Sequence, residues 1–175
     1  MKRWFRRLAP LGFALAISAC GPAIDWREMR PEGVQLTMAM PCRPATHERA
    51  LTLAGQPATM RLYVCQVQDM TFALGHADLA DPLRIGPALQ ALGDSARRNV
   101  DGRAEREQPA AVPGMTPHPL ARHWRLAGRM PDGRAVSSSV TVFAFGTRVY
   151  QATVVGQTLD EGLLRQFEQA LAVRP

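Results

Sequence analysis

The sequence is poor in cysteine, has a single lysine (Lys2), and lacks an apolar run long enough to cross a membrane. Its 175 residues contain three cysteines, too few for a small scaffold held by several disulfides. The apolar run from Leu11 to Ala19 is shorter than the about 20 residues that a membrane-spanning helix needs. No Cys-x-x-Cys pair, phosphate-binding glycine loop or Gly-x-Ser-x-Gly elbow occurs, so the usual signatures of redox sites, nucleotide sites and α/β-hydrolases are absent.

The composition is that of one globular domain. Hydrophobic residues make up 46% and charged residues 21%, a balance that excludes wholesale disorder. At about 100–200 residues per domain, 175 residues suffice for one domain with a sizeable core.

The first twenty residues have the order of a secretory signal. Four basic residues within the first seven positions precede the apolar run, which matches the n-region and h-region of a signal peptide. Ile17-Ser18-Ala19-Cys20 then resembles the bacterial lipobox. That resemblance implies cleavage before Cys20 and a diacylglycerol thioether on its sulfur. Gly21, where aspartate would signal inner-membrane retention, indicates the outer membrane and its periplasmic face.

The net charge changes once this segment is removed. The whole chain carries +6, which by itself would suggest a nucleic-acid partner. Without the four basic residues of the signal, 17 arginines face 15 acidic residues, and the mature net charge is +2. These arginines are dispersed along the chain. We therefore expect no nucleic-acid partner.

Cys42 and Cys65 are the two cysteines left after acylation of Cys20. The periplasm is oxidising, so an even pair there usually forms a disulfide. Cys42 follows one expected strand and Cys65 lies inside another, which makes a bridge feasible. Two buried free thiols, or a redox or metal-binding pair, are the alternatives.

Hydrophobic periodicity predicts an α+β domain with two main helices. Residues 34–40 alternate as a half-buried strand, residues 48–53 and 59–67 form two strands and a turn, and 71–76 form another. A helix begins near Gly86-Pro87, and a three-stranded meander covers 120–155. A capping box from Thr158 to Glu161 opens the final helix. We expect a signal peptide over 1–19, an acylated tether over 20–31 and the domain over 32–175, with a single antiparallel sheet flanked by the two helices.

This order of elements resembles the PsbP-like family. The resemblance is carried by Met40-Pro41 at the end of the first strand and by the closing segments Gly146-Thr147-Arg148-Val149-Tyr150 and Val155-Gly156, followed by a helix with Phe167. It implies a binding or accessory role, and it supplies no catalytic residue.

Residues with chemical potential are scattered. Ser137, Ser138 and Ser139 with His123 and Asp132 contain the residue types of a hydrolase triad, but we expect these serines on a strand surface. His76 with Asp78 and Asp81 could form a loop metal site, although such a trio also arises by chance. Glu105 and Glu107 would share one strand face, but nothing marks them as an acid–base pair, and we expect them to be solvated.

The sequence thus predicts an outer-membrane lipoprotein without catalytic residues, metal or cofactor. Its expected role is to bind a partner in the cell envelope, with the loops at 78–86 and 110–119 as the candidate surface. A lipid or small-molecule carrier is the alternative, and a hydrolase or metalloenzyme a further one.

Overall fold

The computed structural model of the chain describes residues 24–174, and its architecture is mainly β. Half of these residues (50%) are in strands and 18% are in helices. The larger sheet has seven antiparallel strands, and its members in chain order are β3 (Ala45–Leu53), β4 (Gln56–Val67), β5 (Met70–Asp78), β6 (Arg103–Pro109), β7 (Arg122–Arg129), β8 (Ala135–Phe145) and β9 (Arg148–Gly156). Their spatial order is β3-β4-β5-β9-β8-β7-β6.

A second, smaller sheet is formed by segments that are far apart in the sequence. It has the order β1-β2-β10, and its strands are β1 (Arg27–Met29), β2 (Leu36–Met40) and β10 (Ala172–Val173). The helical elements are the 3-10 turn η1 (Pro82–Arg84), α1 (Ile85–Asn99) and α2 (Glu161–Gln169).

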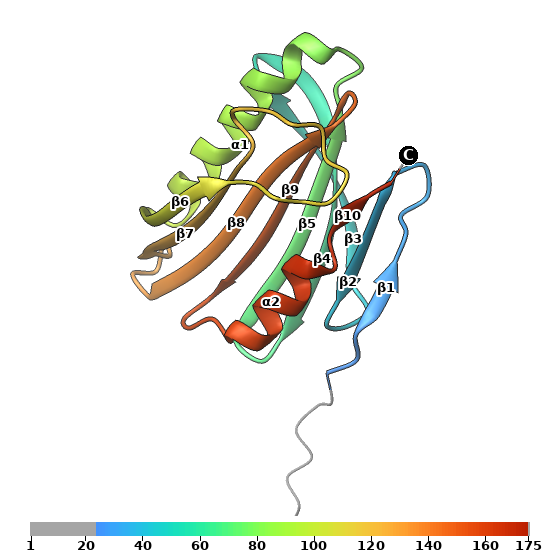
Figure 1. The fold of residues 1–175 in the computed structure, drawn as a ribbon. Coiled ribbons are helices and arrows are strands. Elements are labelled where there is room, and N and C mark those ends of the chain that lie inside the picture. Colours follow the sequence, from blue (N-terminus) through green and yellow to red (C-terminus); the bar gives the residue numbers. More distant parts are fainter. Residues whose placement is uncertain (1–23, 175) are drawn as a thin grey trace, which may run out of the picture.

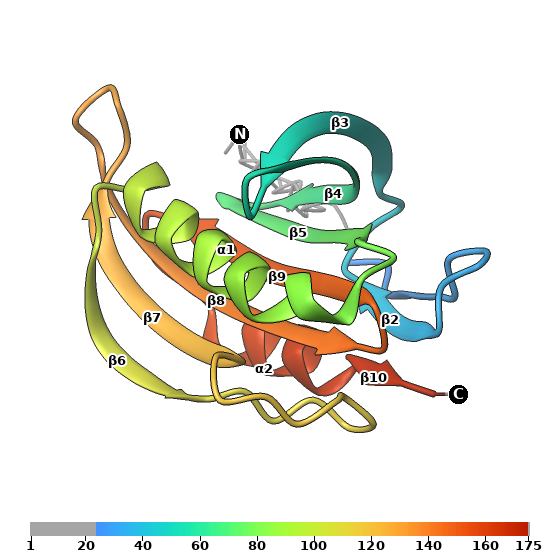
Figure 2. The same cartoon turned by 90° about the horizontal axis from the view of Figure 1, so that it is seen from above.

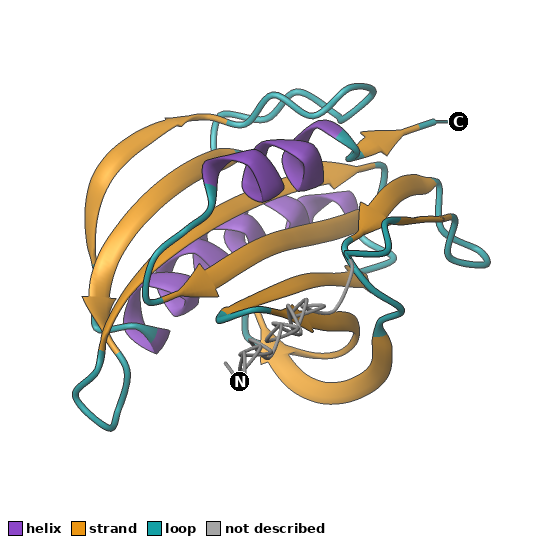
Figure 3. Ribbon diagram, turned by 90° about the horizontal axis from the view of Figure 1, so that it is seen from below, coloured by secondary structure: helices purple, strands orange, loops and turns teal. Residues whose placement is uncertain are grey.

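The two faces of the large sheet are covered by different layers. Helix α1 packs on one face of the large sheet (Figure 1). Its Gly93 lies against the ring of Trp124. Helix α2 and the small sheet cover the other face, and Phe167 of α2 meets Phe72 of β5 edge-to-face with ring centroids 5.5 Å apart. Figures 2 and 3, seen from above and from below, show the two helices on opposite sides of the sheet.

The prediction of a single antiparallel sheet flanked by two helices, and with it the PsbP-like arrangement, is wrong. The three-stranded sheet forms a second β layer, and α2 contacts this layer as well as the large sheet. The reason is that β1 and β10 are only three and two residues long, so each acquires strand geometry only by pairing with β2. The tether predicted over 20–31 overlaps the fold, because residues 27–29 form β1.

Several local predictions are confirmed. Helix α1 begins at Ile85, beside the predicted Gly86-Pro87, and Gly146-Thr147 forms the two-residue turn between β8 and β9. The predicted capping box at the last helix is wrong by two residues. Asp160 is the N-cap of α2, because its carboxylate accepts hydrogen bonds from the backbone N–H groups of Gly162 and Leu163.

A disulfide joins the two β layers. Cys42, just after β2, is bonded to Cys65 of β4, with their Cα atoms 5.9 Å apart. This confirms the predicted pairing, so the two thiols are not free. Since β2 belongs to the small sheet and β4 to the large one, the bond ties one layer covalently to the other.

Neither helix of the described chain has the length and apolar character needed to cross a bilayer.

Replacement of Gly93 by alanine tests the packing of α1. A Cβ atom on Gly93 would lie 2.5 Å from Cη2 of Trp124, and the Arg97 guanidinium lies 5.6 Å from the ring centroid of that tryptophan. Alanine normally stabilises a helix relative to glycine by about 1 kcal/mol. Here we expect Gly93→Ala to lower the free energy of unfolding by about 1–3 kcal/mol, because the ring must move. Urea denaturation measures this, with exposed Gln90→Ala on the same helix as control; stabilisation by Gly93→Ala would contradict the packing.

Candidate functional site

A row of polar side chains crosses the large sheet on the face opposite α1. Glu48 of β3, Arg61 of β4, His76 of β5 and Tyr150 of β9 are directly opposite one another in successive strand pairs. Residues in such register point to the same face of a sheet. The strand alternation of four separate segments therefore brings these groups together.

Two ion pairs flank His76 in this row. On one side Arg61 donates from Nε to Oε1 of Glu48 at 3.0 Å. On the other side Arg148 donates from Nη2 to Oδ2 of Asp78 at 3.0 Å and from Nη1 to the carbonyl of Gly33 at 2.9 Å. Both arginines are thereby held in fixed positions around the imidazole.

The imidazole of His76 is buried and incompletely hydrogen-bonded. The residue is 8% exposed, and its Nε2 is buried without a partner among the described residues. Its ring lies between those of Tyr63 and Tyr150, with centroid distances of 6.1 and 6.2 Å. Burial lowers the pKa of His76 to about 4, and the positive charges of Arg148 and Arg61 add to this shift. The imidazole is therefore neutral at neutral pH.

An open groove of about 560 Å³ lies over this row. Part of its lining is apolar and comes from the hairpin of β3 and β4, with Ala50, Leu51, Pro57 and Ala58. The rest is polar and includes Arg61, His76, Asp78 and Arg148. The groove offers guanidinium and imidazole hydrogen-bonding groups beside small apolar side chains. That combination can bind a ligand, but it contains no serine or cysteine nucleophile.

The metal interpretation of His76, Asp78 and Asp81 finds no geometric support. Asp78 accepts hydrogen bonds from the Ala80 N–H at 3.0 Å and from the Thr147 hydroxyl at 2.8 Å, which lower the pKa of its carboxyl. Asp81 instead accepts from the N–H of Leu83 and caps η1. Within residues 24–174, no group of three or more His, Cys, Asp or Glu side chains is placed to hold a metal ion.

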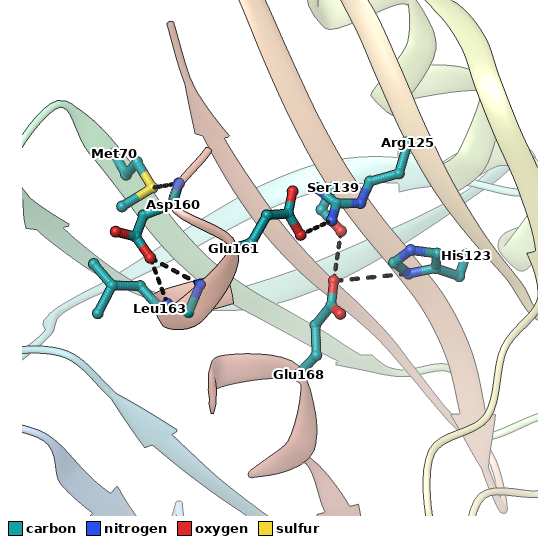
Figure 4. Close-up of polar contacts among 9 residues, drawn as sticks. Met70, His123, Arg125, Ser139, Asp160, Glu161, Leu163 and Glu168 are labelled. Carbon is teal, nitrogen blue, oxygen red and sulfur yellow. Dashed lines mark hydrogen bonds and ion pairs between the residues drawn. The ribbon is translucent and has the colours of Figure 1, made fainter. Parts of the chain in front are cut away.

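The serines and histidine of the hypothetical triad do come close, but around a different carboxylate. Ser139 of β8 donates to Oε1 of Glu168 on α2 at 2.6 Å (Figure 4). Nδ1 of His123 lies 2.9 Å from Thr141 Oγ1 and 4.0 Å from that same Glu168 oxygen. Asp132 is elsewhere, in the turn after β7, where it pairs with Arg134. Sequence reasoning missed Glu168, since only the docking of α2 brings it to β8.

This arrangement does not have the connections of a serine hydrolase. The Ser139 hydroxyl is bonded to a carboxylate and not to the imidazole that would have to accept its proton. Ser138 and Ser139 are 2% and 3% exposed, so the expectation of surface serines is wrong. Burial lowers the pKa of His123, and the nearby Glu168 carboxylate opposes that shift. The group is a buried polar cluster beneath α2.

A second groove, of about 570 Å³, opens beside this cluster and carries charges of both signs. Arg106, Arg125 and Glu161 line it, and Arg125 donates to Oε2 of Glu161 at 2.6 Å. Glu105 also lines it, next to a bulge between Ala104 and Arg106. Glu107 pairs with Arg122 at 3.3 Å, so Glu105 and Glu107 do not form one acid–base pair.

The loops predicted as the binding surface lie side by side. A Cβ on Gly86 would be 3.4 Å from the ring of His118 and 3.8 Å from Leu120. Leu83 in η1 is 87% exposed and Leu120 is 37% exposed, which makes them the large hydrophobic residues most open to solvent in the described chain. We refer to Leu83, Gly86, His118 and Leu120 as the distal loop surface.

The second of these loops is anchored and not freely exposed. The N–H of Thr116 donates to the carbonyl of Ala144 at 2.8 Å, and the N–H of Val173 donates to the carbonyl of Pro113 at 2.8 Å. Val112 is buried. The loop therefore presents a defined surface. Cys20, the predicted lipidation site, lies outside the described residues.

The protonation of His76 should couple folding to pH. An unfolded histidine has a pKa of about 6.5, and the folded value is about 4, so the unfolded chain binds more protons between these values. We expect the His76 contribution to stability to be complete above about pH 6.5 and to be lost progressively toward pH 4, by at most about 3 kcal/mol. Ring NMR signals, assigned with His76→Gln, should titrate near pH 4. A midpoint at or above 6.5 would contradict the burial argument.

Comparison with known proteins assigns no family. No protein-family model matches the chain, and no curated protein matches it at a significant level.

Proposed function

We propose that this chain is an outer-membrane lipoprotein, acylated on Cys20, whose domain has a non-enzymatic binding role on the periplasmic face. The observation that carries the proposal is the order of its first twenty residues. Four basic residues come first, and the uncharged run from Leu11 to Ala19 follows them. The run ends in Ile17-Ser18-Ala19-Cys20, and this order has the spacing of a lipoprotein signal. Several acyl chains on one residue would give stable anchoring, where a single chain is marginal.

The disulfide supports export. Bonds such as Cys42–Cys65 persist in oxidising compartments, of which the bacterial periplasm is one, and are rare in the cytosol. With these two cysteines bonded to each other, Cys20 is the thiol that remains available for a lipid.

The geometry of the domain fits an anchor at its N-terminal end. The first described backbone hydrogen bond from this end joins the Asp25 N–H to the carbonyl of Pro41. Asp25 comes five positions after Cys20, so a fully extended link would reach about 18 Å. The described chain begins at the lower end of the domain in Figure 1, and the loop from β5 to α1 lies at the upper end. In an anchored molecule, the distal loop surface would face away from the bilayer.

The sites favour binding over catalysis or lipid transport. The Ser139 hydroxyl is committed to Glu168, and the carboxylates of Asp78 and Glu48 are committed to arginines. Both grooves are open to solvent and have charged side chains in their lining, whereas a carrier of apolar molecules needs an enclosed and mostly apolar pocket. Large aromatic side chains such as Phe72, Phe143 and Tyr150 fill the core.

Lipidation is tested with the full chain expressed in a bacterium fed an alkyne fatty acid. We expect the wild type to incorporate the label and to fractionate with the outer membrane, and Cys20→Ser to do neither, because the thioether needs a sulfur. A Cys42→Ser, Cys65→Ser double variant is the control and should keep the label. An unlabelled wild type, or a labelled Cys20→Ser variant, would refute the proposed anchor.

The binding role is tested by photo-crosslinking in intact cells. A crosslinker at Pro82, beside Leu83, should capture a discrete envelope protein, and the same group at Asp132 in the turn after β7 should not. Leu83→Asp combined with Leu120→Asp should reduce the capture about tenfold, since a charge at an apolar contact costs on the order of 1.4 kcal/mol or more. Capture that is unchanged in the double variant would rule out this surface.

A further inference from the structure

The large sheet has two edge strands, and they differ in how they are protected. β6 contains a bulge between Ala104 and Arg106, ends in Pro109 and carries four charged residues. Bulges, charges and proline are the devices by which proteins prevent an edge from pairing with another strand. β3, at the other edge, pairs with β4 over nine consecutive residues without a bulge or a proline.

The turn after β3 determines which of its amides are free. Ala54 and Gly55 both have positive φ (54° and 75°), as in a two-residue type I′ hairpin, so Leu53 and Gln56 close the turn as a hydrogen-bonded pair. Because hydrogen-bonded and non-hydrogen-bonded pairs alternate, the even-numbered residues of β3 direct their N–H and C=O groups outward. These residues are Thr46, Glu48, Ala50 and Thr52.

Pro57 provides an independent check on this assignment. Pro57 lies opposite Thr52, and the alternation makes this pair non-hydrogen-bonded. The missing N–H of Pro57 therefore removes no hydrogen bond between β3 and β4. Residues 45–50 are all exposed, and no strand among residues 24–174 pairs with the outer side of β3. The edge is therefore regular, extended and open.

A second copy of this chain is a poor match for the full length of the edge. In an antiparallel pair of two copies, the outward-facing, even-numbered residues would bond to one another, so residues of the same parity would lie opposite each other. The one register that pairs all nine residues of β3 sets Arg49 against its own counterpart. Like charges directly opposite each other destabilise a strand pair. The charge at the centre of β3 thus opposes self-pairing over the full length of the strand, and a shifted register pairs seven residues or fewer.

The free charge on β3 defines the chemistry of a better partner. The charge of Glu48 is neutralised by Arg61 on the neighbouring strand β4, whose Nη2 lies 2.5 Å from Oε1 of Glu48. Arg49 points to the other face, and no ion pair of Arg49 occurs among the described residues. An incoming strand with a carboxylate on that face would satisfy Arg49 and add a favourable cross-strand pair.

We propose that the outer edge of β3 binds an extended segment of another protein, with an acidic side chain beside Arg49, as an eighth strand of the sheet. Backbone hydrogen bonds to the four outward-facing residues would supply the affinity, and the Arg49 pair would supply selectivity. This surface is separate from the distal loop surface and does not depend on acylation.

The test is selection of a randomised nine-residue peptide library against the disulfide-bonded domain. We expect enriched peptides to contain aspartate or glutamate at one central position, and Arg49→Glu to change that preference to lysine or arginine. Ala50→Pro removes one outward N–H and should weaken binding of the selected peptides about tenfold, whereas Ala50→Val should preserve it.

Amide hydrogen exchange on the wild-type domain gives a readout that does not depend on how the variants fold. A bound peptide should newly protect the amides of Thr46, Glu48, Ala50 and Thr52, while those of His47, Arg49 and Leu51 are already bonded to β4. Failure to enrich any peptide would overturn the proposal. So would peptides that bind Ala50→Pro as well as wild type, or that protect amides of the distal loops only.

Discussion

Burial of both faces of the central strands is the constraint on which the rest of this structure depends. β8 is buried at eight of its eleven positions, seven of them in an unbroken run from Ser138 to Ala144, and Val140, Val142 and Phe143 are almost fully enclosed. A strand with two buried faces needs a layer on each side. Helix α1 supplies one layer, while α2 and the small sheet together supply the other. The disulfide and the anchored loop around Thr116 hold parts of that second layer in place.

The local elements of this fold could be predicted, and the second layer could not. Alternating apolar residues and turn signals such as Gly146-Thr147 placed the hairpins, and the apolar stripe placed α1, because these patterns act over a few residues. β1, β2 and β10 come from both ends of the chain and pair over only two or three residues each. No periodicity in such short segments could reveal their partners.

The failure to predict the second layer also explains the wrong predictions at the polar sites. Ser139 was expected at the surface because a sheet with one open face places alternate residues in water. Helix α2 covers that face and brings Glu168 to Ser139. In contrast, the row from Glu48 to Tyr150 is fixed by strand register, and that register depends on two hairpin pairings and one long-range pairing that one sequence does not specify. The sequence therefore shows which polar residues are present, but not which of them contact one another in the fold.

The disulfide has a mechanical consequence. An anchor upstream of residue 24 would transmit tension into β1, whose three pairs with β2 could be peeled apart one after another. Peeling would have to stop at Cys42, because from there the load passes through a covalent bond to Cys65 and into β4, a twelve-residue strand held between β3 and β5 in the large sheet. The extensible part of the molecule would then end at Cys42, and the grooves and edges of the large sheet would keep their shape while the chain ahead of them is stretched.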